Sequence, residues 1–413
     1  IDLCNNEKIK TSPKFSKFKN SDIIDVSGCI VVGRAGRGKS WTLMNKIIPQ
    51  LDDQYLIVSL THKALENLTQ IPKNKKRTLA SLFMDKGESQ RTMLEGIASS
   101  VSTIILEEYT MSSQKDLIKL YKLHQLGVSI ILIGDHHQIP AIDNRPIKSI
   151  DYSFIREMCP ILVELTHNHR FDQDLDDLSM RVYNEGIFEP TPEMKLNPEE
   201  KTRLNICYYR KTKFNINKQF SDANKLLNTP RVKTKDGHVA ISGSPVICTE
   251  KLEGQLVNGT MCDIVNIVEG SVIIKADKEY TIATKKFTKN FVLGHAGTTH
   301  CFQGSTIKGD LTIHDTGSMT RELLYTALTR AEGISHIKVK SSGTVRDIKH
   351  TRYYNKYDPS VLICKNMKDM KTGYIFMNKE TNAFGYTTIK PKNNIISTIQ
   401  YYDEMELRTE AQF

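Results

Sequence analysis

Short apolar runs alternate with amphipathic stretches over the first 170 residues. Five runs have the length of strands: CIVVG (29–33), YLIVSL (55–60), STIIL (102–106), VSIILIG (128–134) and ILVEL (161–165). Continuous apolar strands that alternate with helices are typical of a parallel sheet covered on both faces. The pattern therefore predicts an α/β domain over 28–170, preceded by a polar, lysine-rich lead-in at 1–27.

A second alternating region covers 171–342. Its apolar runs are SPVICTE (244–250), the hairpin-like CDIVNIVEGSVIIKA (262–276), LTIHD (311–315) and HIKVKS (336–341). The segment near 260–290 reads as β structure throughout, which predicts a small β insertion in a second α/β domain. Residues 343–413 are polar and form a predicted C-terminal extension with one hairpin around 377–387.

A phosphate-binding loop follows the first apolar run. The stretch GRAGRGKS has the spacing G-x-x-x-x-G-K-S, and the residues after it have the spacing of a helix. A glycine loop between a strand and a helix presents backbone N–H groups to phosphates; the lysine reaches the β- and γ-phosphates and the serine holds Mg²⁺. The predicted cofactors are therefore a nucleoside triphosphate, taken as ATP, and Mg²⁺. The predicted nucleotide-binding residues are Gly33, Arg34, Ala35, Gly36, Arg37, Gly38, Lys39, Ser40 and Trp41.

Catalytic candidates follow the later apolar runs. Glu107 and Glu108 come at the end of one run, and we assign Glu107 to Mg²⁺ and Glu108 to the attacking water. Gln138, after the next run, is placed to sense the γ-phosphate. Arg170 and Arg330 are candidates to stabilise the charge of the transition state, as a motor ATPase requires.

Composition narrows the classes of function. The chain has 413 residues, of which 39% are hydrophobic and 25% charged, as in soluble globular proteins. No apolar run reaches membrane-spanning length, and no secretory signal opens the chain. Eight cysteines without a C-x-x-C pair predict an intracellular, reducing compartment, the cytoplasm or nucleus of a host cell. The net charge of +10 favours a polyanionic partner.

Six motifs together carry a family resemblance. GRAGRGKS, LEEYTM, GDHHQIP, LTHNHR, AGTTHCFQGST and LLYTALTRA occur in the order and spacing of superfamily 1 helicases. PVICTEKLEGQLVNGT resembles the segment before the β-barrel insertion of the RecD-like and PIF-type branch, superfamily 1B. The resemblance implies two RecA-like domains: 1A over 28–170, with a short 1B insertion near 84–100, and 2A over 171–342, with a β-barrel-like 2B insertion.

The resemblance also implies roles for particular residues. Gln303, Gly304 and Arg330 would reach the nucleotide from the second domain. Nucleic acid would bind at positions that match the family's strand contacts, namely Thr61, His62, Lys63, Thr298 and His300. The family usually has Asp where this chain has Glu107.

Three functions stay open at this stage. The first is a DNA helicase that moves 5′–3′ on single-stranded DNA in replication or repair. The second is an RNA helicase or NTPase of viral type, and the third is a nucleic-acid-binding ATPase that does not separate strands. Because the chain begins with Ile, we expect it to be a module of a longer polypeptide, with an N-terminal portion or other replication proteins as partners. A large DNA virus or mobile element is the expected source, and the oligomeric state stays open.

Overall fold

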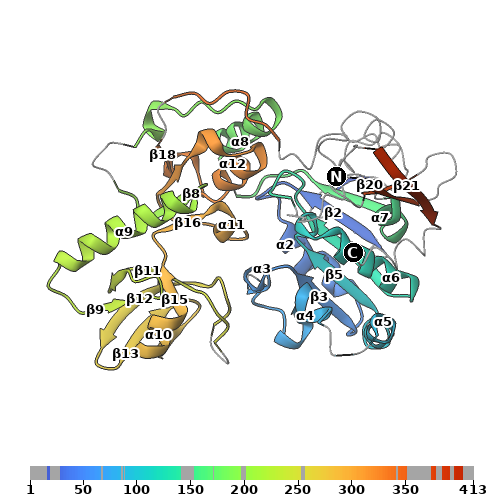
Figure 1. Cartoon of the computed structure of the whole chain (residues 1–413), viewed down its shortest axis with the longest axis horizontal. Coiled ribbons are helices and arrows are strands. Elements are labelled where there is room, and N and C mark those ends of the chain that lie inside the picture. The colour runs from blue at the N-terminus through green and yellow to red at the C-terminus, as the bar shows by residue number, and fades with distance from the viewer. Residues whose placement is uncertain are drawn as a thin grey trace.

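The computed structural model describes two α/β domains and an antiparallel sheet (Figure 1). The described residues are 28–66, 68–84, 87, 89–140, 153–170, 172–196, 201–252, 256–340 and 343–350, together with strands at 16–18, 374–377, 384–390 and 395–402. No helix within these residues is long and apolar enough to cross a membrane.

The first domain is built on a seven-stranded parallel sheet with the order β1-β7-β2-β6-β5-β3-β4. Its strands are β1 (Ser16–Phe18), β2 (Cys29–Gly33), β3 (Tyr55–Ser59), β4 (Lys76–Thr78), β5 (Thr103–Glu107), β6 (Ser129–Gly134) and β7 (Ile161–Leu165). Its helices are α2 (Lys39–Thr42), α3 (His62–Glu66), α4 (Leu79–Leu82), α5 (Gln90–Ala98), α6 (Gln114–Gln125) and α7 (Ser153–Met158). The five predicted strands are present, and the carboxyl ends of β2, β5, β6 and β7 carry the motifs.

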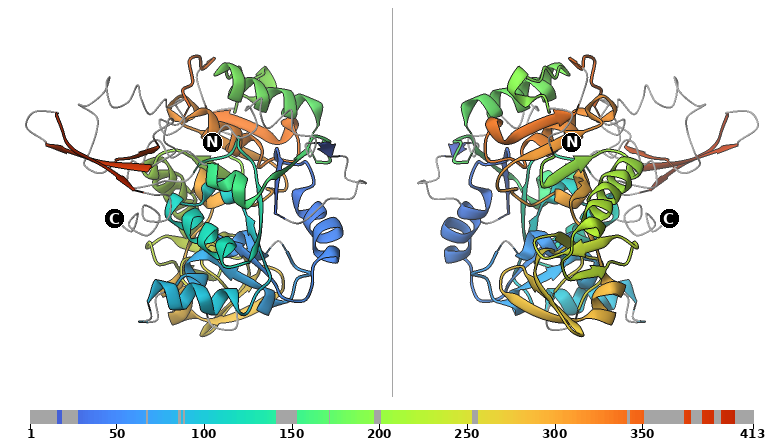
Figure 2. Two further views of the ribbon diagram at one scale, coloured as in Figure 1. Left: turned by 90° about the vertical axis from the view of Figure 1, so that its right-hand side faces the viewer. Right: turned by 90° about the vertical axis from the view of Figure 1, so that its left-hand side faces the viewer.

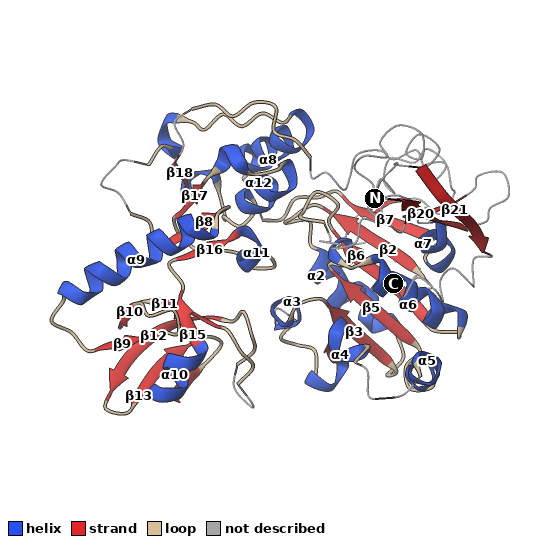
Figure 3. Cartoon of the chain, in the orientation of Figure 1, coloured by secondary structure: helices blue, strands red, loops and turns tan. Residues whose placement is uncertain are grey.

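Both faces of this sheet are buried, which explains why its strands are apolar at consecutive positions. Ile104 points into a cluster with α5, α6 and α7, whereas its neighbour Ile105 points into the opposite cluster with the helix after the phosphate loop. Figure 3 shows the resulting layers of helix, sheet and helix.

The second domain has a four-stranded parallel sheet with the order β16-β8-β17-β18. Its strands are β8 (Leu204–Cys207), β16 (Ala296–Thr298), β17 (Leu311–His314) and β18 (Ile337–Lys340), and its helices are α8 (Gln173–Glu185), α9 (Arg210–Leu226), α11 (Thr299–Phe302) and α12 (Arg321–Leu328). A shared core joins α8 and α12, where Leu175 and Val182 pack with Leu324 and Leu328. Helix α8 is therefore part of the second domain.

The β insertion is wider than the expected 260–290. An antiparallel sheet with the order β14-β13-β12-β11-β15 comprises β11 (Pro245–Cys248), β12 (Met261–Val268), β13 (Ser271–Lys275), β14 (Glu279–Ala283) and β15 (Phe291–Leu293), with α10 (Thr284–Asn290). A hairpin of β9 (Arg231–Lys233) and β10 (Val239–Ile241) precedes it. The sequence pattern found the central hairpin and the apolar run at β11, but it did not place β11 in this sheet or find β15, because these two strands pair over 45 residues of separation.

The structure adds detail to three further predicted segments. The lead-in contains a strand, β1, which pairs with β7, and the rest of 1–27 lies outside the described residues. The insertion expected near 84–100 contains helix α5, which packs beside α6. The hairpin expected around 377–387 is present as β19 (Tyr374–Met377) and β20 (Phe384–Lys390), and a third antiparallel strand, β21 (Ile395–Tyr402), pairs with β20. Figure 2 shows the last two, in red, standing to one side of the two domains.

Candidate functional site

The phosphate loop connects β2 to α2 as the sequence predicts. Gly36 and Gly38 have positive φ angles of 76° and 79°, a conformation that favours glycine, and the helix begins at Lys39. The Lys39 ammonium donates to the carbonyl oxygens of Gly33 at 2.8 Å and Arg34 at 3.2 Å. The loop's own carbonyl oxygens thus hold the Lys39 ammonium beside the backbone N–H groups that a phosphate would bind.

The two arginines of the loop are instead directed at the second domain. The guanidinium of Arg37 donates to Asp176 at 2.6 Å, and that of Arg34 donates to the same carboxylate oxygen at 3.1 Å. Asp176 lies in the first half of α8, in the second domain. What these two residues offer a nucleotide in this conformation is therefore their backbone, while Trp41 is 49% exposed at the start of the helix.

The acidic pair lies at the carboxyl end of β5. Glu107 is the last residue of the strand, and Glu108 adopts a left-handed conformation with φ 56°. Burial raises the pKa of Glu107 to about 8, with a further contribution from the charge of Glu108. Burial also raises the pKa of Glu108, and the ammonium of Lys39 opposes that shift. Two carboxylates and one lysine thus form a single electrostatic unit.

Several buried polar atoms around this unit have no hydrogen-bond partner among the described residues. They are Glu107 Oε1, Glu108 Oε2, Gln138 Oε1 and both amide atoms of Gln303. Unpaired buried polar atoms are costly, and a cluster of them indicates a site that a ligand or ion completes. Gln138 comes from the first domain and Gln303 from the second, so such a ligand would be held from both sides.

These unpaired polar atoms fit a magnesium–nucleotide complex. Within the described part of the chain no three His, Cys, Asp or Glu side chains come together as a metal site. Mg²⁺ in nucleotide-binding sites takes one or two protein oxygens and completes its shell with phosphates and water. Glu107, with its unpaired Oε1, and the exposed hydroxyl of Ser40 meet that requirement.

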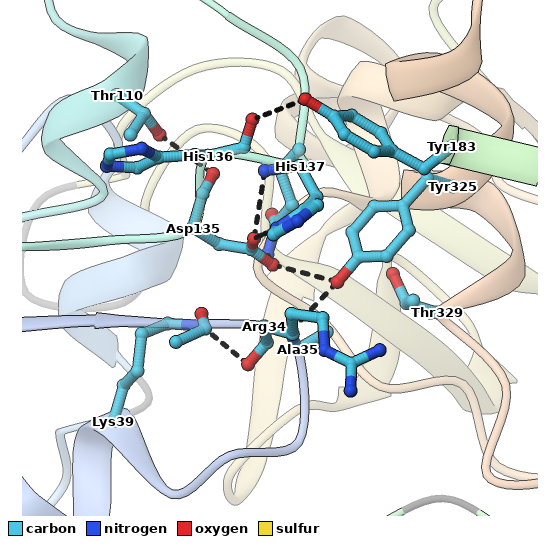
Figure 4. A network of polar contacts seen from close by, with 12 residues as sticks. Arg34, Ala35, Lys39, Thr110, Asp135, His136, His137, Tyr183, Tyr325 and Thr329 are labelled. Carbon is cyan, nitrogen blue, oxygen red and sulfur yellow. Dashed lines mark hydrogen bonds and ion pairs between the residues drawn. The ribbon is translucent and has the colours of Figure 1, made fainter. Parts of the chain in front are cut away.

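Asp135, which is not among the residues predicted from the sequence, is the carboxylate to which several groups of the site donate hydrogen bonds (Figure 4). It is fully buried and accepts hydrogen bonds from the backbone N–H and ring of His137, both at 3.0 Å, and from Gln138 Nε2 at 3.0 Å. Burial by itself raises its pKa, but the His137 hydrogen bonds and the charge of Lys39 outweigh this and hold the pKa well below the usual range. Asp135 is therefore a carboxylate.

Tyr325 connects this carboxylate to the second domain. Its hydroxyl donates to Asp135 Oδ2 at 3.1 Å and accepts from the backbone N–H of Ala35 at 3.1 Å, so one side chain of α12 touches both the phosphate loop and the end of β6 (Figure 4). Tyr183 of α8 lies beside it, with its ring 4.6 Å from that of His137. Tyr325 lies within the recognised motif LLYTALTRA, but nothing local in the sequence marks its partners.

The two candidate arginines come close to each other from different domains. Arg170 donates to Thr306 at 2.9 Å and to the carbonyl of Thr329 at 3.2 Å. Arg330 is 3% exposed and donates to the carbonyls of Thr326 and Ser305 at 2.9 and 3.1 Å. Burial and, to a smaller extent, the charge of Arg330 lower the pKa of Arg170 to about 10.

The surface alternative for Arg330 is wrong. On local sequence alone, Arg330 could pair with Glu322 or Glu332 on an exposed helix face. Instead Arg330 is buried, and the Glu322 carboxylate pairs with His350 at 2.6 Å. The charge of Glu108 raises the pKa of Arg330 against the effect of burial, which places this guanidinium within electrostatic range of the acidic pair.

A cavity of about 280 Å³ lies between the domains beside this site. The residues that line it include four of the five predicted strand contacts. They are Ser59, Leu60, Thr61, His62, Lys63, Ala64, Glu108, Met111, Asn258, Gly259, His300, Cys301, Gln303 and Gly304. The fifth predicted contact, Thr298, precedes α11 and bonds with Cys301 of that helix. Asn258 and Gly259, which reach the cavity from the β insertion, were not predicted.

Contacts across this cavity join the domains. Lys63 of α3 donates to the carbonyl of Cys301 at 3.1 Å, and the hydroxyl of Thr260 donates to Glu66 at 3.1 Å. Burial lowers the pKa of Lys63 to about 8, and burial also lowers the pKa of His62 and His300. The histidines of the cavity are consequently neutral at pH 7, whereas Lys63 contributes a positive charge to its lining.

Comparisons with known proteins agree with this architecture. Residues 25–187 match the AAA domain family. The Pif1 helicase from Candida albicans superimposes with a TM-score of 0.58 at 17% identity, over 79% of this chain and 93% of that one. The Bacteroides Pif1 helicase in complex with ADP-AlF3 and single-stranded DNA gives a TM-score of 0.56 at 16% identity, over 82% and 92%.

A second Bacteroides Pif1 structure, bound to single-stranded DNA, gives a TM-score of 0.55 at 18% identity, over 76% of this chain and 89% of that one. No curated protein matches the chain by sequence. The six motifs, the AAA-domain match and the shared architecture agree, and the chain has the two-domain fold of the Pif1-type superfamily 1B helicases.

Proposed function

We propose that the protein is an ATP-dependent helicase that moves along single-stranded DNA and separates duplex strands. One observation carries the proposal: Glu108, Gln303 and Gly304 of the hydrolysis site line the same cavity as Thr61, His62 and His300. A strand in that cavity would lie against the group that activates water. Hydrolysis and strand movement are then parts of one mechanism.

The roles of the residues follow from their positions. Lys39 and the loop N–H groups bind the β- and γ-phosphates, and Ser40 with Glu107 would hold Mg²⁺, which supplies charge neutralisation between the phosphates. Glu108 orients a water and takes its proton as the water attacks the γ-phosphorus, while the bond to the bridging oxygen breaks and the electron pair leaves with ADP. The raised pKa of Glu108 makes it a stronger base for this proton.

The second domain completes the reaction centre. Arg170 and Arg330 supply cationic donors to the transition state, and Gln138 and Gln303 respond to the presence of the γ-phosphate. Because these groups come from both domains, ATP favours a closed arrangement that hydrolysis releases. Repeated closure against a strand in the cavity would move the protein by ratcheting.

The resemblance to superfamily 1B supports 5′–3′ movement and a role in replication or repair. The Pif1 structures bound to single-stranded DNA support DNA as the partner. An RNA helicase or a strand-stimulated ATPase without unwinding would use the same nucleotide site, so these two functions are the alternatives that the experiment has to separate.

The test combines ATP hydrolysis with unwinding. Hydrolysis is measured alone and with single-stranded DNA or RNA of one sequence, and unwinding is measured on duplexes with a 5′ or a 3′ single-stranded tail. We expect stimulation by DNA and unwinding of the 5′-tailed duplex, with Lys39→Ala inactive in both assays because it lacks the main phosphate-binding charge.

Each other outcome selects an alternative. Stimulation by RNA alone supports the RNA enzyme, and stimulation without unwinding supports the simple ATPase. Unwinding of the 3′-tailed duplex contradicts the proposed polarity, and hydrolysis that no strand stimulates contradicts the shared-cavity argument.

A further inference from the structure

A buried ion-pair cluster links the phosphate loop to the second domain. One oxygen of Asp176 accepts from Arg37 at 2.6 Å and from Arg34 at 3.1 Å. Asp176 is 6% exposed and Arg37 is 3% exposed, so this contact is largely removed from water. None of the roles assigned above uses this carboxylate or these two guanidinium groups.

Both ends of the cluster are held firmly. The helix that carries Asp176 is capped by Asp172, whose carboxylate accepts from Leu175 N at 2.8 Å and from Ile334 N at 2.8 Å. Leu175, the neighbour of Asp176, is fully buried in the core of the second domain. Asp176 is therefore fixed to the second domain, while Arg34 and Arg37 belong to the loop that wraps the phosphates.

The charges point to a role in nucleotide binding. The loop already offers a lysine and backbone N–H groups to a nucleotide, and two more cations in the same eight residues would attract ATP and ADP alike. Binding substrate and product equally does not accelerate the reaction, and tight product binding slows release. A carboxylate that draws both guanidinium groups away leaves Lys39 as the side-chain cation of the loop directed at the phosphates.

We propose that Asp176 is a positioning residue that holds Arg34 and Arg37 away from the phosphates, links the loop to the second domain, and thereby keeps ADP binding weak enough for rapid turnover. The inference rests on the proposed ATPase function. It predicts that loss of the carboxylate frees the arginines to bind phosphate, so that nucleotide affinity rises while turnover falls.

The experiment measures ADP affinity directly. Trp41 is the only tryptophan of the chain and lies directly after the phosphate-loop serine. Energy transfer from Trp41 to an ADP that carries a methylanthraniloyl group therefore reports binding at this loop. We expect Asp176→Asn to bind this ADP about fivefold more tightly or better, the effect of one charge beside a diphosphate, and to lower both kcat and KM for ATP.

Asp174→Asn is the matched control. It removes the same charge from the same helix, but Asp174 is exposed, so ADP affinity should change by less than about twofold. The double variant Arg34→Gln with Asp176→Asn should lose much of the tightening, because one freed cation is gone. Unchanged or weaker ADP binding by Asp176→Asn, with a lower melting temperature, would show that the cluster is merely structural and overturn the proposal.

Arg34→Gln alone keeps the proposal testable if Asp176→Asn does not fold. Since Arg34 is 27% exposed and already paired, its loss should weaken ADP binding by no more than about twofold. A loss of about tenfold or more would mean that Arg34 contacts phosphate directly, contrary to the proposal. ADP binding does not require hydrolysis, so a wild-type protein that binds ADP without ATPase activity refutes the proposed function while the affinities still test Asp176.

Discussion

Replacing Tyr325 with phenylalanine would remove one hydroxyl and two interdomain hydrogen bonds. The hydroxyl is buried, donates to the Asp135 carboxylate and accepts from the Ala35 N–H. The ring of phenylalanine fits the same space, so packing is retained. The N–H of Ala35 loses its hydrogen-bond partner. Asp135 loses one donor but keeps its hydrogen bonds from His137 and Gln138.

The magnitude follows from these two bonds. A hydrogen bond to a charged group contributes about 1.5–3 kcal/mol, and a buried N–H without a partner costs about 1–3 kcal/mol. Because Asp135 keeps other donors, we expect a combined loss of about 3 kcal/mol in unfolding free energy. For domains of this size that corresponds to a fall in melting temperature of about 6–12 °C.

The assay is thermal unfolding of the nucleotide-free protein, paired with ATP hydrolysis. Tyr183→Phe is the control, because the Tyr183 hydroxyl donates to the carbonyl of His136 over a long distance of 3.4 Å. We expect the control to lose less than about 1 kcal/mol, and Tyr325→Phe to raise KM for ATP, because the phosphate loop loses one of its supports. Melting temperatures of the two variants that agree within error, with unchanged hydrolysis, would refute the coupling through Tyr325.

Three further predictions concern the same site. Arg330→Ala should retain most nucleotide affinity and lose about 10³-fold or more of strand-stimulated hydrolysis, with Arg330→Lys rescuing poorly because it lacks the planar fork; normal stimulated rates would exclude a role in the transition state. The pKa of Glu107, raised to about 8 in the folded protein against an ordinary 4.5, means that this group stabilises the nucleotide-free fold below pH 4.5 and that the contribution is lost as pH rises to about 8. Magnesium–nucleotide binding at pH 7 should accordingly release a proton, which calorimetry in buffers of different ionisation enthalpy detects, and Glu107→Gln should abolish that release. Gly134→Ala should destabilise the fold by about 1–3 kcal/mol, because its Cβ would lie 2.8 Å from the ring of Tyr109, whereas Gly96→Ala, which meets no atom within 4 Å, should not; equal melting temperatures would contradict this packing argument.

The sequence predicted those parts of the site that depend on local signals. Apolar runs predicted the strands of the first domain. The catalytic candidates of that domain lie at or after strand ends, because parallel strands present their carboxyl ends at one edge. The spacing of the glycines and the adjacent Lys-Ser predicted the loop from eight consecutive residues, and two of its glycines have positive φ angles in the structure. Glu107 and Glu108 were selected by the same reasoning, since Glu107 is the last residue of a buried strand and Glu108 follows it.

The unpredicted parts depend on contacts between distant segments. Asp135 and Tyr325 are 190 residues apart, and Asp176 is 139 residues from Arg37. Such pairs form only when two domains close on each other, and hydrophobic periodicity reports which face of an element is buried, not what it meets. Arg330 illustrates the limit. Its neighbours in the sequence allow a surface ion pair, whereas tertiary packing buries it.

The distribution of charges in the site explains why these distant contacts are needed. The phosphate loop brings Lys39, Arg34 and Arg37 together within eight residues, beside Glu107, Glu108 and Asp135 from two neighbouring strands. Buried charges are tolerated when each has a partner, and removal of one partner leaves another exposed to the low dielectric of the interior. Asp135 is matched by Lys39 and His137, and the two loop arginines are matched by Asp176. Glu107 and Glu108 are not fully matched, which is why burial raises their pKa values. The unpaired carboxylates therefore lie where magnesium and the attacking water would bind. The other buried charges of the site are paired, and the two loop arginines obtain their partner from the second domain.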